Sequence, residues 1–252
     1  CNNFCSYCIV PYTRGRERSR EPESILGELA DLKIKGFKEV TLLGQNVNSY
    51  RYERPDGTVV DFPALLALVA QSAEGMRVRF TTSHPKDMSD ETLRIIAAYP
   101  NVCRHIHLPV QSGSNRILKL MNRKYTKESY LDLVDRIRKG CPDISLTTDI
   151  IVGFPGETEE EFAKTCEFAE RIRFYEIHVF KYSKREGTVA AAMKDQVQES
   201  VKNDRSTRLI TLAENLKQEY MQWYEEKKVP VLFERKVERD GKLYYEGFTP
   251  EY

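Results

Sequence analysis

The chain has 252 residues, of which 40% are apolar and 31% are charged, a composition that excludes a disordered or collagen-like protein. No window approaches the roughly 18 to 20 consecutive apolar residues of a membrane-spanning helix, and the sequence does not open with a secretory signal. We therefore expect a cytoplasmic protein without a membrane partner. Because 39 Lys and Arg stand against 38 Asp and Glu, the net charge of +1 cannot attract nucleic acid by itself. Such a partner would need a local basic patch.

Short β-rich runs alternate with amphipathic stretches between residues 22 and 181, a pattern typical of βα units around a parallel sheet. Strands are predicted at 38–43, 77–82, 105–110, 145–152 and 175–181. Helices are predicted at 22–35, 63–74, 89–98, 115–121, 126–139 and 158–172. Start signals for these helices are Pro22, Pro63, Ser89, Thr126 and Thr158, and Gly36 and Gly140 are expected at helix C-caps. We predict an α/β fold, a partial (β/α)6 TIM-like barrel, in which side chains at the strand ends carry the chemistry.

After the barrel the pattern changes to a long helix, predicted at 199–226, and a β-hairpin around Asp240-Gly241. We divide the chain into a core at 1–198, a helical extension at 199–228 and the start of a small β domain at 229–252. One strand is missing from the front of the pattern, and the chain begins at Cys1 instead of a methionine. We expect a piece of a longer protein.

Three cysteines, Cys1, Cys5 and Cys8, lie within eight residues, a density of soft thiolates that suits zinc or an iron–sulfur cluster. A structural zinc site would need a fourth ligand at finger-like distance, but the next candidates are His84 and Cys103. This spacing favours a [4Fe–4S] cluster with one iron left open. A zinc knuckle that lacks a ligand, and chance thiols, remain alternatives.

Several motifs resemble one family in order along the chain. The cysteine pattern, with Tyr7 before its last cysteine, resembles the signature of radical S-adenosylmethionine enzymes. Together with it, PYTRGRERSREP, GQNVNSY, HLPVQSGS, MNRKYT and GFPGET make nearly the whole chain similar to the core of the tRNA methylthiotransferases. The fold implied is a radical SAM barrel followed by a TRAM-like β domain.

The resemblance implies one [4Fe–4S] cluster at Cys1, Cys5 and Cys8, the catalytic centre, whose open iron binds S-adenosylmethionine. An electron passed through the cluster would split this cofactor into methionine and a deoxyadenosyl radical that removes hydrogen from carbon 2 of an adenine beside the anticodon. A second, auxiliary [4Fe–4S] cluster would supply sulfur, and a second S-adenosylmethionine the methyl group. The implied partners are the anticodon stem-loop of tRNA and a reducing electron donor of the flavodoxin or ferredoxin type. We expect a monomer.

The resemblance also assigns contacts with S-adenosylmethionine to polar residues at the strand ends. They are Gly44, Gln45 and Asn46 for the amino group; Ser83, with Thr82, for the methionine part; Gln111 and Ser112 for the ribose; and Phe180, Lys181 and Tyr182 for the adenine. The first set could simply form a tight turn, and the second could simply cap a helix. Tyr7, Asp149 and the glycines of GFPGET complete the expected set, because a carboxylate within an apolar strand must be paired or used. Arg123 is a candidate partner for the cofactor carboxylate, with a solvated arginine as the alternative.

Four arginines, Arg14, Arg16, Arg18 and Arg20, alternate directly after the cysteine loop. In an extended segment they would share one side and form a basic stripe suited to RNA phosphates. Such a run is more often a solvated surface, but its place beside the cluster loop favours RNA.

Two further sets are assigned structural roles. His105 and His107 alternate along a strand and are expected to line or support the barrel instead of binding metal. The scattered Cys103, Cys141 and Cys166 are expected to act as small hydrophobes, outside any cluster.

Full-length members of the family carry an N-terminal domain with three further cysteines and a complete C-terminal β-barrel. The first is absent from this sequence and the second is only begun. We therefore expect this piece to bind one cluster and S-adenosylmethionine and to lack the sulfur source.

The substrate indications differ between the two halves. Up to about Leu146 the sequence resembles the branch that acts on isopentenyl-adenosine, and from about Asp149 it resembles the branch that acts on threonylcarbamoyl-adenosine. We favour the first, because the front half holds the cluster loop and most strand ends; a natural intermediate and a joined sequence both fit. Alternatives from other classes are a methylthiotransferase of a ribosomal protein and a catalytically silent RNA-binding core.

Overall fold

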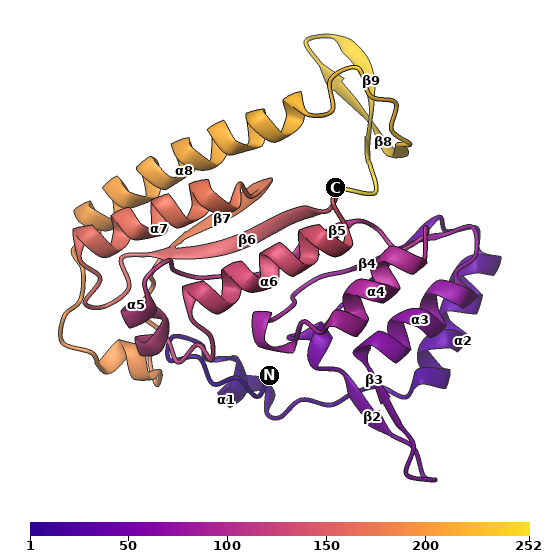
Figure 1. Ribbon diagram of the computed structural model, residues 1–252, viewed down its shortest axis with the longest axis horizontal. Helices are drawn as coiled ribbons and strands as arrows, with labels where there is room; N and C mark the ends of the chain where they lie inside the picture. The colour runs from indigo at the N-terminus through magenta and orange to yellow at the C-terminus, as the bar shows by residue number, and fades with distance from the viewer.

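The computed structural model describes residues 1–252, and its parallel strands form an open, curved wall with helices packed around it (Figure 1). β1 (Glu39–Leu42) pairs with β4 (Arg77–Phe80). β6 (Ser145–Val152) lies between β5 (His105–His107) and β7 (Glu176–Lys181). A parallel bridge from Val78 to Val102 connects the two groups. All five predicted strands are present, and the prediction of a partial α/β barrel is confirmed.

The wall is open at β1, which has a partner strand on one side only. This is the edge at which the sequence pattern lacks a first strand.

The helices of the barrel begin where the sequence places their caps. They are α2 (Pro22–Ile34), α3 (Phe62–Ser72), α4 (Asp90–Ala98), α5 (Asn115–Leu120), α6 (Lys127–Gly140) and α7 (Glu159–Ile172). Thr126 and Thr158 each close a capping box, in which the N-cap hydroxyl accepts from the N3 amide and the N3 side chain accepts from the N-cap amide. The prediction for Gly140 was wrong, because it is the last residue of α6 and Cys141 caps that helix.

The main core lies between these helices and the strands. Phe62 packs edge-to-face on Phe80 with ring centroids 5.2 Å apart, and Tyr130 packs on Phe168 and Phe174 in the same way. The buried Tyr130 hydroxyl donates to the carbonyl of Leu108 at 2.7 Å, so this large aromatic side chain also has its polar atom satisfied.

Several short elements were not predicted. They are α1 (Val10–Arg14), the antiparallel pair β2 (Arg51–Glu53) and β3 (Val59–Asp61), and the 3₁₀ turns η1 (Val47–Ser49), η2 (Pro85–Asp87) and η3 (Val189–Ala192). The β2–β3 hairpin does carry a turn signal, since Gly57 has φ +84° and the Asp56 carboxylate accepts from the Thr58 amide at 2.8 Å. Strands of three residues are too short to show a periodic pattern.

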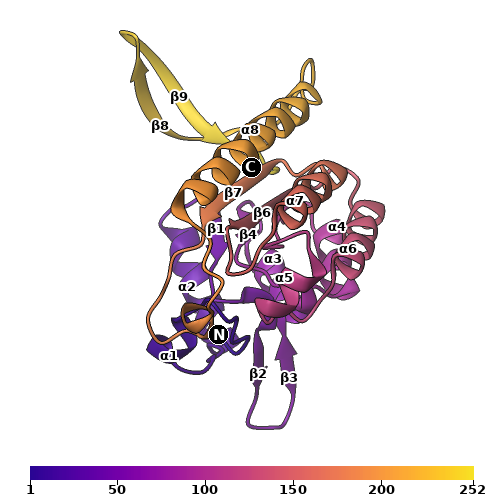
Figure 2. The same ribbon diagram turned by 90° about the vertical axis from the view of Figure 1, so that its left-hand side faces the viewer.

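The C-terminal part follows the predicted order. α8 (Glu199–Gln222) packs along β7 and α7, and it ends four residues before the predicted end. The hairpin of β8 (Leu232–Arg239) and β9 (Lys242–Phe248) projects away from the barrel (Figure 2). Asp240 and Gly241 both have positive φ, as a two-residue hairpin turn requires.

After β9 the chain returns to the N-terminal ends of the barrel strands. Arg77 Nη1 donates to the Phe248 carbonyl at 2.7 Å, and Arg79 Nη1 to the Pro250 carbonyl at 3.2 Å. Tyr252 stacks on His105 with ring centroids 4.9 Å apart. The returning segment therefore covers the end of the barrel opposite to the cysteine loop. Among the helices of the whole chain, none has the length and apolar character needed to cross a membrane.

Candidate active site

The cysteine loop, residues 1–8, is fixed against the segment that follows α5. The Ser6 amide donates to the Met121 carbonyl at 3.0 Å, and its hydroxyl donates to the Leu120 carbonyl at 2.7 Å. The Ala190 amide in turn donates to the Ser6 carbonyl at 2.8 Å. Because α5 follows β5, these bonds hold the loop at the carboxyl ends of the strands, where barrel enzymes bind their substrates.

Asn122 is a second anchor of this loop, and the sequence analysis missed it. It has φ +59°, and its amide nitrogen donates to the Phe4 carbonyl at 2.8 Å. An asparagine directly after the C-cap of a helix, here Met121, is a known signal for a left-handed residue, so this role could have been inferred from MNRKYT.

The three thiols of the loop are half-buried, and none forms a disulfide. Two of them accept hydrogen bonds from side chains of the protein. Asn3 Nδ2 donates to Cys1 Sγ at 3.4 Å, and Arg123 Nη1 donates to Cys5 Sγ at 3.3 Å. Donors aimed at sulfur stabilise negative charge on the ligands of a metal centre.

The spacing of the thiols suits a cluster better than a single ion. In a tetrahedral zinc site, Zn–S bonds of about 2.3 Å bring the sulfurs to within about 4 Å of one another. The sulfurs of Cys1, Cys5 and Cys8 are not within 4.8 Å of one another, since the chain has only one such set of three ligand atoms and it lies elsewhere. Three thiolates with wider spacing and no fourth protein ligand fit an iron–sulfur cluster with an open iron.

The structure places Arg123 against the cysteine loop. Besides Cys5, its guanidinium donates to the Tyr125 hydroxyl at 2.8 Å and to the Pro109 carbonyl at 3.0 Å. Burial alone would lower the pKa of Arg123, but Tyr125, Tyr7 and Cys5 beside it raise the pKa above its usual range, so the group stays charged. These bonds use three of the five N–H donors of the guanidinium, one on each nitrogen.

Four predicted contact residues carry buried polar atoms without a hydrogen-bond partner. These atoms are Asn46 Oδ1, Ser83 Oγ, Gln111 Oε1 and the Tyr182 hydroxyl oxygen. They account for most of the chain's seven orphaned buried side-chain atoms, and all follow the carboxyl ends of β1, β4, β5 and β7. Leaving such an atom unpaired costs free energy, so their concentration at one end of the barrel indicates a place for a polar ligand.

Backbone geometry supports this placement for two of the four. Gln111 has φ +71°, and its carbonyl accepts from the Ile151 amide at 3.0 Å, so the backbone is fixed while the side chain remains free. Thr82, beside Ser83, has φ +63°, and its carbonyl accepts from the Val47 amide at 3.1 Å. This bond brings Asn46 and Ser83 to neighbouring positions. Strained residues of this kind gather at ligand sites.

Other predicted contacts are engaged elsewhere. Ser112 is fully buried, and its hydroxyl accepts from the Ser114 amide at 3.2 Å and lies 3.4 Å from that of Thr165 on α7. Lys181 Nζ donates to Glu199 and Asn203 on α8, each at 2.7 Å.

The remaining predicted contacts differ in exposure. The side chains of Gln45 and Phe180 are exposed, and Tyr7 packs edge-to-face on Phe154. Asp149 lies within β6, 3.4 Å from His107, and not at a strand end.

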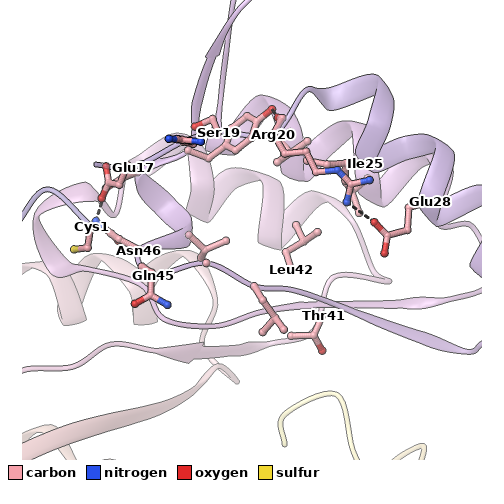
Figure 3. A pocket seen from close by; sticks show the side chains of 18 of the residues that line it. Cys1, Glu17, Ser19, Arg20, Ile25, Glu28, Thr41, Leu42, Gln45 and Asn46 are labelled. Carbon is pink, nitrogen blue, oxygen red and sulfur yellow. Dashed lines mark hydrogen bonds and ion pairs between the residues drawn. The ribbon is translucent and has the colours of Figure 1, made fainter. Parts of the chain in front are cut away.

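A cavity of about 710 Å³ opens beside the cysteine loop. Figure 3 shows Cys1 near Gln45 and Asn46 at one end of it, and Arg20 facing Glu28 at the other. Apolar side chains of α2, β1 and α3 form the floor next to the open edge of β1, and residues 14–20 form the rim. A volume of this size is typical of small-molecule sites.

The arginine stripe alternates in exposure between Arg16 and Arg20, whereas Arg14 is the last residue of α1. Arg14, Arg16, Arg18 and Arg20 are exposed, whereas Glu17 and Ser19 between them are half-buried. Arg20 forms an ion pair with Glu28, but the other three arginines have no side-chain partner. The stripe therefore offers three free positive charges beside the cysteine loop.

The GFPGET turn after β6 is held from α8. Gly153 has φ +70°, and a Cβ there would lie 2.4 Å from Cγ of Lys202. Its amide donates to Glu157 at 2.7 Å, and Arg205 Nη1 donates to the same carboxylate at 2.8 Å. Both members of this ion pair are buried, at 5% and 1% side-chain exposure.

Comparisons with known proteins agree with this geometry. Residues 1–169 match the model of the radical SAM superfamily. The chain shares its fold with coproporphyrinogen III oxidase from Escherichia coli, a radical SAM enzyme (TM-score 0.61, 16% identity, 86% of this chain and 50% of that one), and with methylornithine synthase (TM-score 0.56, 19% identity, 84% and 60%). The chain belongs to the radical SAM superfamily.

Within it, the chain is similar to proteins named tRNA-2-methylthio-N(6)-dimethylallyladenosine synthase. The relative from Bacteroides thetaiotaomicron is 62% identical over 220 residues, 87% of this chain and 48% of the relative. The relative from Thermoanaerobacter pseudethanolicus is 55% identical over 242 residues, 96% and 51% respectively. The resemblance to tRNA methylthiotransferases is thereby confirmed, and it extends beyond the front half. The chain spans about half the length of these relatives.

Proposed function

We propose that this chain is the radical SAM core of an enzyme that adds a methylthio group to carbon 2 of dimethylallyl-adenosine in tRNA. The observation that carries the proposal is the identity of 55–62% to synthases of that name, over a chain whose loop of three cysteines is anchored at the carboxyl ends of the strands. When bound, a [4Fe–4S] cluster would supply the electron that cleaves S-adenosylmethionine.

The chain's own residues would hold and orient these groups. Cys1, Cys5 and Cys8 would ligate the cluster, and Asn3 and Arg123 would donate to their sulfurs. The orphaned polar atoms at the strand ends are the groups we assign to S-adenosylmethionine. Gly44 lines the cavity together with Asn46, while Phe180 near the end of β7 would face the adenine.

The reconstituted chain provides the first test. Loaded anaerobically with iron and sulfide and then reduced, it should convert S-adenosylmethionine into methionine and deoxyadenosine, and a variant with Cys1, Cys5 and Cys8 changed to Ala should not. Acid-labile sulfide should count one cluster per chain, because the sulfur-donating cluster is assigned to the part of the protein outside this sequence. Absence of cofactor cleavage by a protein with the cluster absorbance would favour the silent RNA-binding core.

The substrate is tested separately, in cells that lack the enzyme and receive the full-length protein. Nucleoside analysis of their tRNA should show the methylthio derivative of the isopentenyl nucleoside. Methylthiolated threonylcarbamoyl-adenosine alone would reject this substrate, and a modified ribosomal protein without modified tRNA would reject the RNA reaction.

RNA binding should depend on the three free arginines of the stripe. In the full-length protein, changing Arg14, Arg16 and Arg18 to Gln should weaken binding of an anticodon stem-loop and flatten its salt dependence, by about 0.7 to 0.9 in the log–log slope for each lost phosphate contact. Arg20→Gln is the matched control and should have a smaller effect, because Glu28 already pairs with Arg20. An unchanged slope in the triple variant would place the RNA elsewhere.

The electron donor, monomeric state and cytoplasmic location stay predictions.

A further inference from the structure

A second group of metal-ligating side chains lies on the neighbouring strands β5, β6 and β7, apart from the cysteine loop. Two of its members, His107 and Asp149, are half-buried and the third, His178, is exposed. His107 ends β5, Asp149 lies in the middle of β6, and His178 is directly opposite Asp149 on β7. One ligand atom from each of the three lies within 4.8 Å of the other two. The set draws on three neighbouring strands of one rigid sheet, so its geometry does not depend on a mobile loop.

These ligand atoms are free of other strong partners. Asp149 Oδ1 lies 3.4 Å from His107 Nε2 and has no other side-chain contact, and His178 has no hydrogen-bond partner. His107 and His178 also line a cavity of about 310 Å³ within the barrel, which leaves room for an ion and water beside them. No lysine or arginine pairs with the Asp149 carboxylate. Arg79, which lines the cavity of His107 and His178, pairs with Glu39 at 2.7 Å.

A neighbouring hydroxyl orients the ring of His107 for ligation. Thr147 Oγ1 is 2.9 Å from His107 Nδ1 and also 2.9 Å from His105 Nε2. With the proton of His107 on Nδ1, this nitrogen donates to Thr147 Oγ1, and the threonine hydroxyl donates in turn to His105 Nε2. Nε2 of His107 then carries a lone pair that faces Asp149 and His178. Metal-binding histidines are commonly fixed through their second nitrogen in this way.

We propose that His107, Asp149 and His178 bind a divalent transition-metal ion, of the Zn²⁺, Fe²⁺ or Co²⁺ class, in the barrel interior. Two imidazole nitrogens and one carboxylate oxygen are a donor set typical of these ions, and they leave further coordination positions to water. The set contains no thiolate, which separates it chemically from the cysteine loop. The sequence pattern alone argued against metal at His107, because only the fold brings His178 and Asp149 to it.

The proposal changes how iron in the reconstituted chain is to be counted. A mononuclear iron at this site adds iron without sulfide, whereas a second cluster adds both. The chain should therefore hold one more iron than sulfide, and Asp149→Asn should remove that excess while the sulfide content stays unchanged. Equal iron and sulfide in the chain as reconstituted would contradict the proposal.

A direct test removes the competing thiols. The 252-residue chain with Cys1, Cys5 and Cys8 changed to Ala, stripped of metal, should bind one equivalent of Co²⁺ with visible d–d absorption and no sulfur-to-cobalt charge-transfer band. Asp149→Asn and His178→Gln should each weaken this binding at least tenfold, and Thr147→Val about tenfold. Glu176→Gln, which changes an acid of the same cavity outside the set, is the control and should leave it unchanged.

Two results would overturn the proposal. One is the absence of Co²⁺ binding by the cysteine-free chain with a native circular dichroism spectrum. The other is binding that survives both Asp149→Asn and His178→Gln, in which case the three side chains form only a polar cluster within the barrel. If the cysteine-free chain does not fold, the proposal is tested by comparing the iron-to-sulfide ratio of the wild-type chain with that of the Asp149→Asn variant.

Discussion

Replacing Arg123 with glutamine should slow cleavage of S-adenosylmethionine by the reduced, cluster-loaded chain about 10- to 100-fold, the usual effect of removing a side chain that supports a metal ligand. The guanidinium bridges Cys5 of the loop, the Pro109 carbonyl after β5 and the Tyr125 hydroxyl. Glutamine is shorter and uncharged, so it cannot reach all three acceptors. The midpoint potential of the cluster should also fall, because a positive charge beside a thiolate ligand favours the reduced state.

Two variants separate charge from geometry in this prediction. Arg123→Lys keeps the positive charge, so the midpoint potential of the cluster should stay close to its wild-type value. Lysine lacks the planar fork of arginine, so the bonds to Pro109 and Tyr125 should be lost. Lys124→Gln is the matched control, because Lys124 is exposed and bonds only to Asn122 at 2.7 Å. The measurements are deoxyadenosine formation and an electrochemical titration followed by electron paramagnetic resonance. Arg123→Gln with wild-type potential and cleavage would show that the Arg123–Cys5 contact has no functional role.

The sequence allowed local features to be predicted well, because their signals lie within a few residues. Thr126 and Thr158 start helices with capping boxes, and Asp240-Gly241 makes the expected hairpin turn. The cysteine loop was likewise readable from the spacing of three residues. Each of these features is fixed by short-range geometry that the order of residues specifies directly.

Contacts between distant segments were not predictable in the same way. Arg123 and Cys5 are 118 positions apart, and the motif around Arg123 gives no indication that its side chain turns toward the loop. Asp149 was recognised as a carboxylate that must be paired, but its partner became visible only when β5 and β7 were placed beside β6. Strand order sets such contacts, and a pattern along the chain shows the strands without their register.

The unpaired polar atoms at the strand ends show how far a position in the sequence predicts a role in the fold. Asn46, Ser83, Gln111 and Tyr182 were chosen from the sequence as strand-end residues of a barrel, and the fold leaves exactly one polar atom of each buried and unpaired. Ser112 and Lys181 were chosen by the same reasoning, yet they bond within the protein. Position at a strand end thus identifies residues that could contact a ligand. Only their hydrogen bonds in the folded protein distinguish the free polar groups from those that stabilise the fold.

Replacing Arg205 with methionine should lower the free energy of unfolding by about 3 to 5 kcal/mol at pH 8. The substitution leaves the buried carboxylate of Glu157 without the guanidinium that now donates to it at 2.8 Å. Arg208→Met is the matched control on the same helix. Arg208 is about half exposed and pairs with Glu159 at 2.7 Å, so its loss should cost no more than about 1 kcal/mol.

The cost of Arg205→Met should depend on pH, because burial raises the pKa of Glu157 to about 7 from an ordinary value of 4.5. A raised carboxyl pKa means that the folded chain binds the proton more tightly, so the contribution of Glu157 to stability is complete below about pH 4.5 and is lost as the pH rises through 7. At pH 5 the protonated carboxyl needs no cation. Because the wild-type carboxyl ionises only over the last unit between pH 5 and pH 8, the loss should be smaller at pH 5 by about 1 kcal/mol. Urea unfolding of the cluster-free chain at pH 5 and pH 8 measures the difference.

A double variant decides whether the unpaired charge is the cause. Glu157→Gln keeps an acceptor for the Gly153 amide but carries no charge, so combining it with Arg205→Met should recover at least half of the stability lost at pH 8. If the double variant were no more stable than Arg205→Met, and if the loss were equal at both pH values, packing of the arginine side chain on Phe162 would be responsible instead. With charge as the cause, Arg205 on α8 compensates the buried carboxylate that accepts from the Gly153 amide, at the end of the barrel where S-adenosylmethionine is proposed to bind.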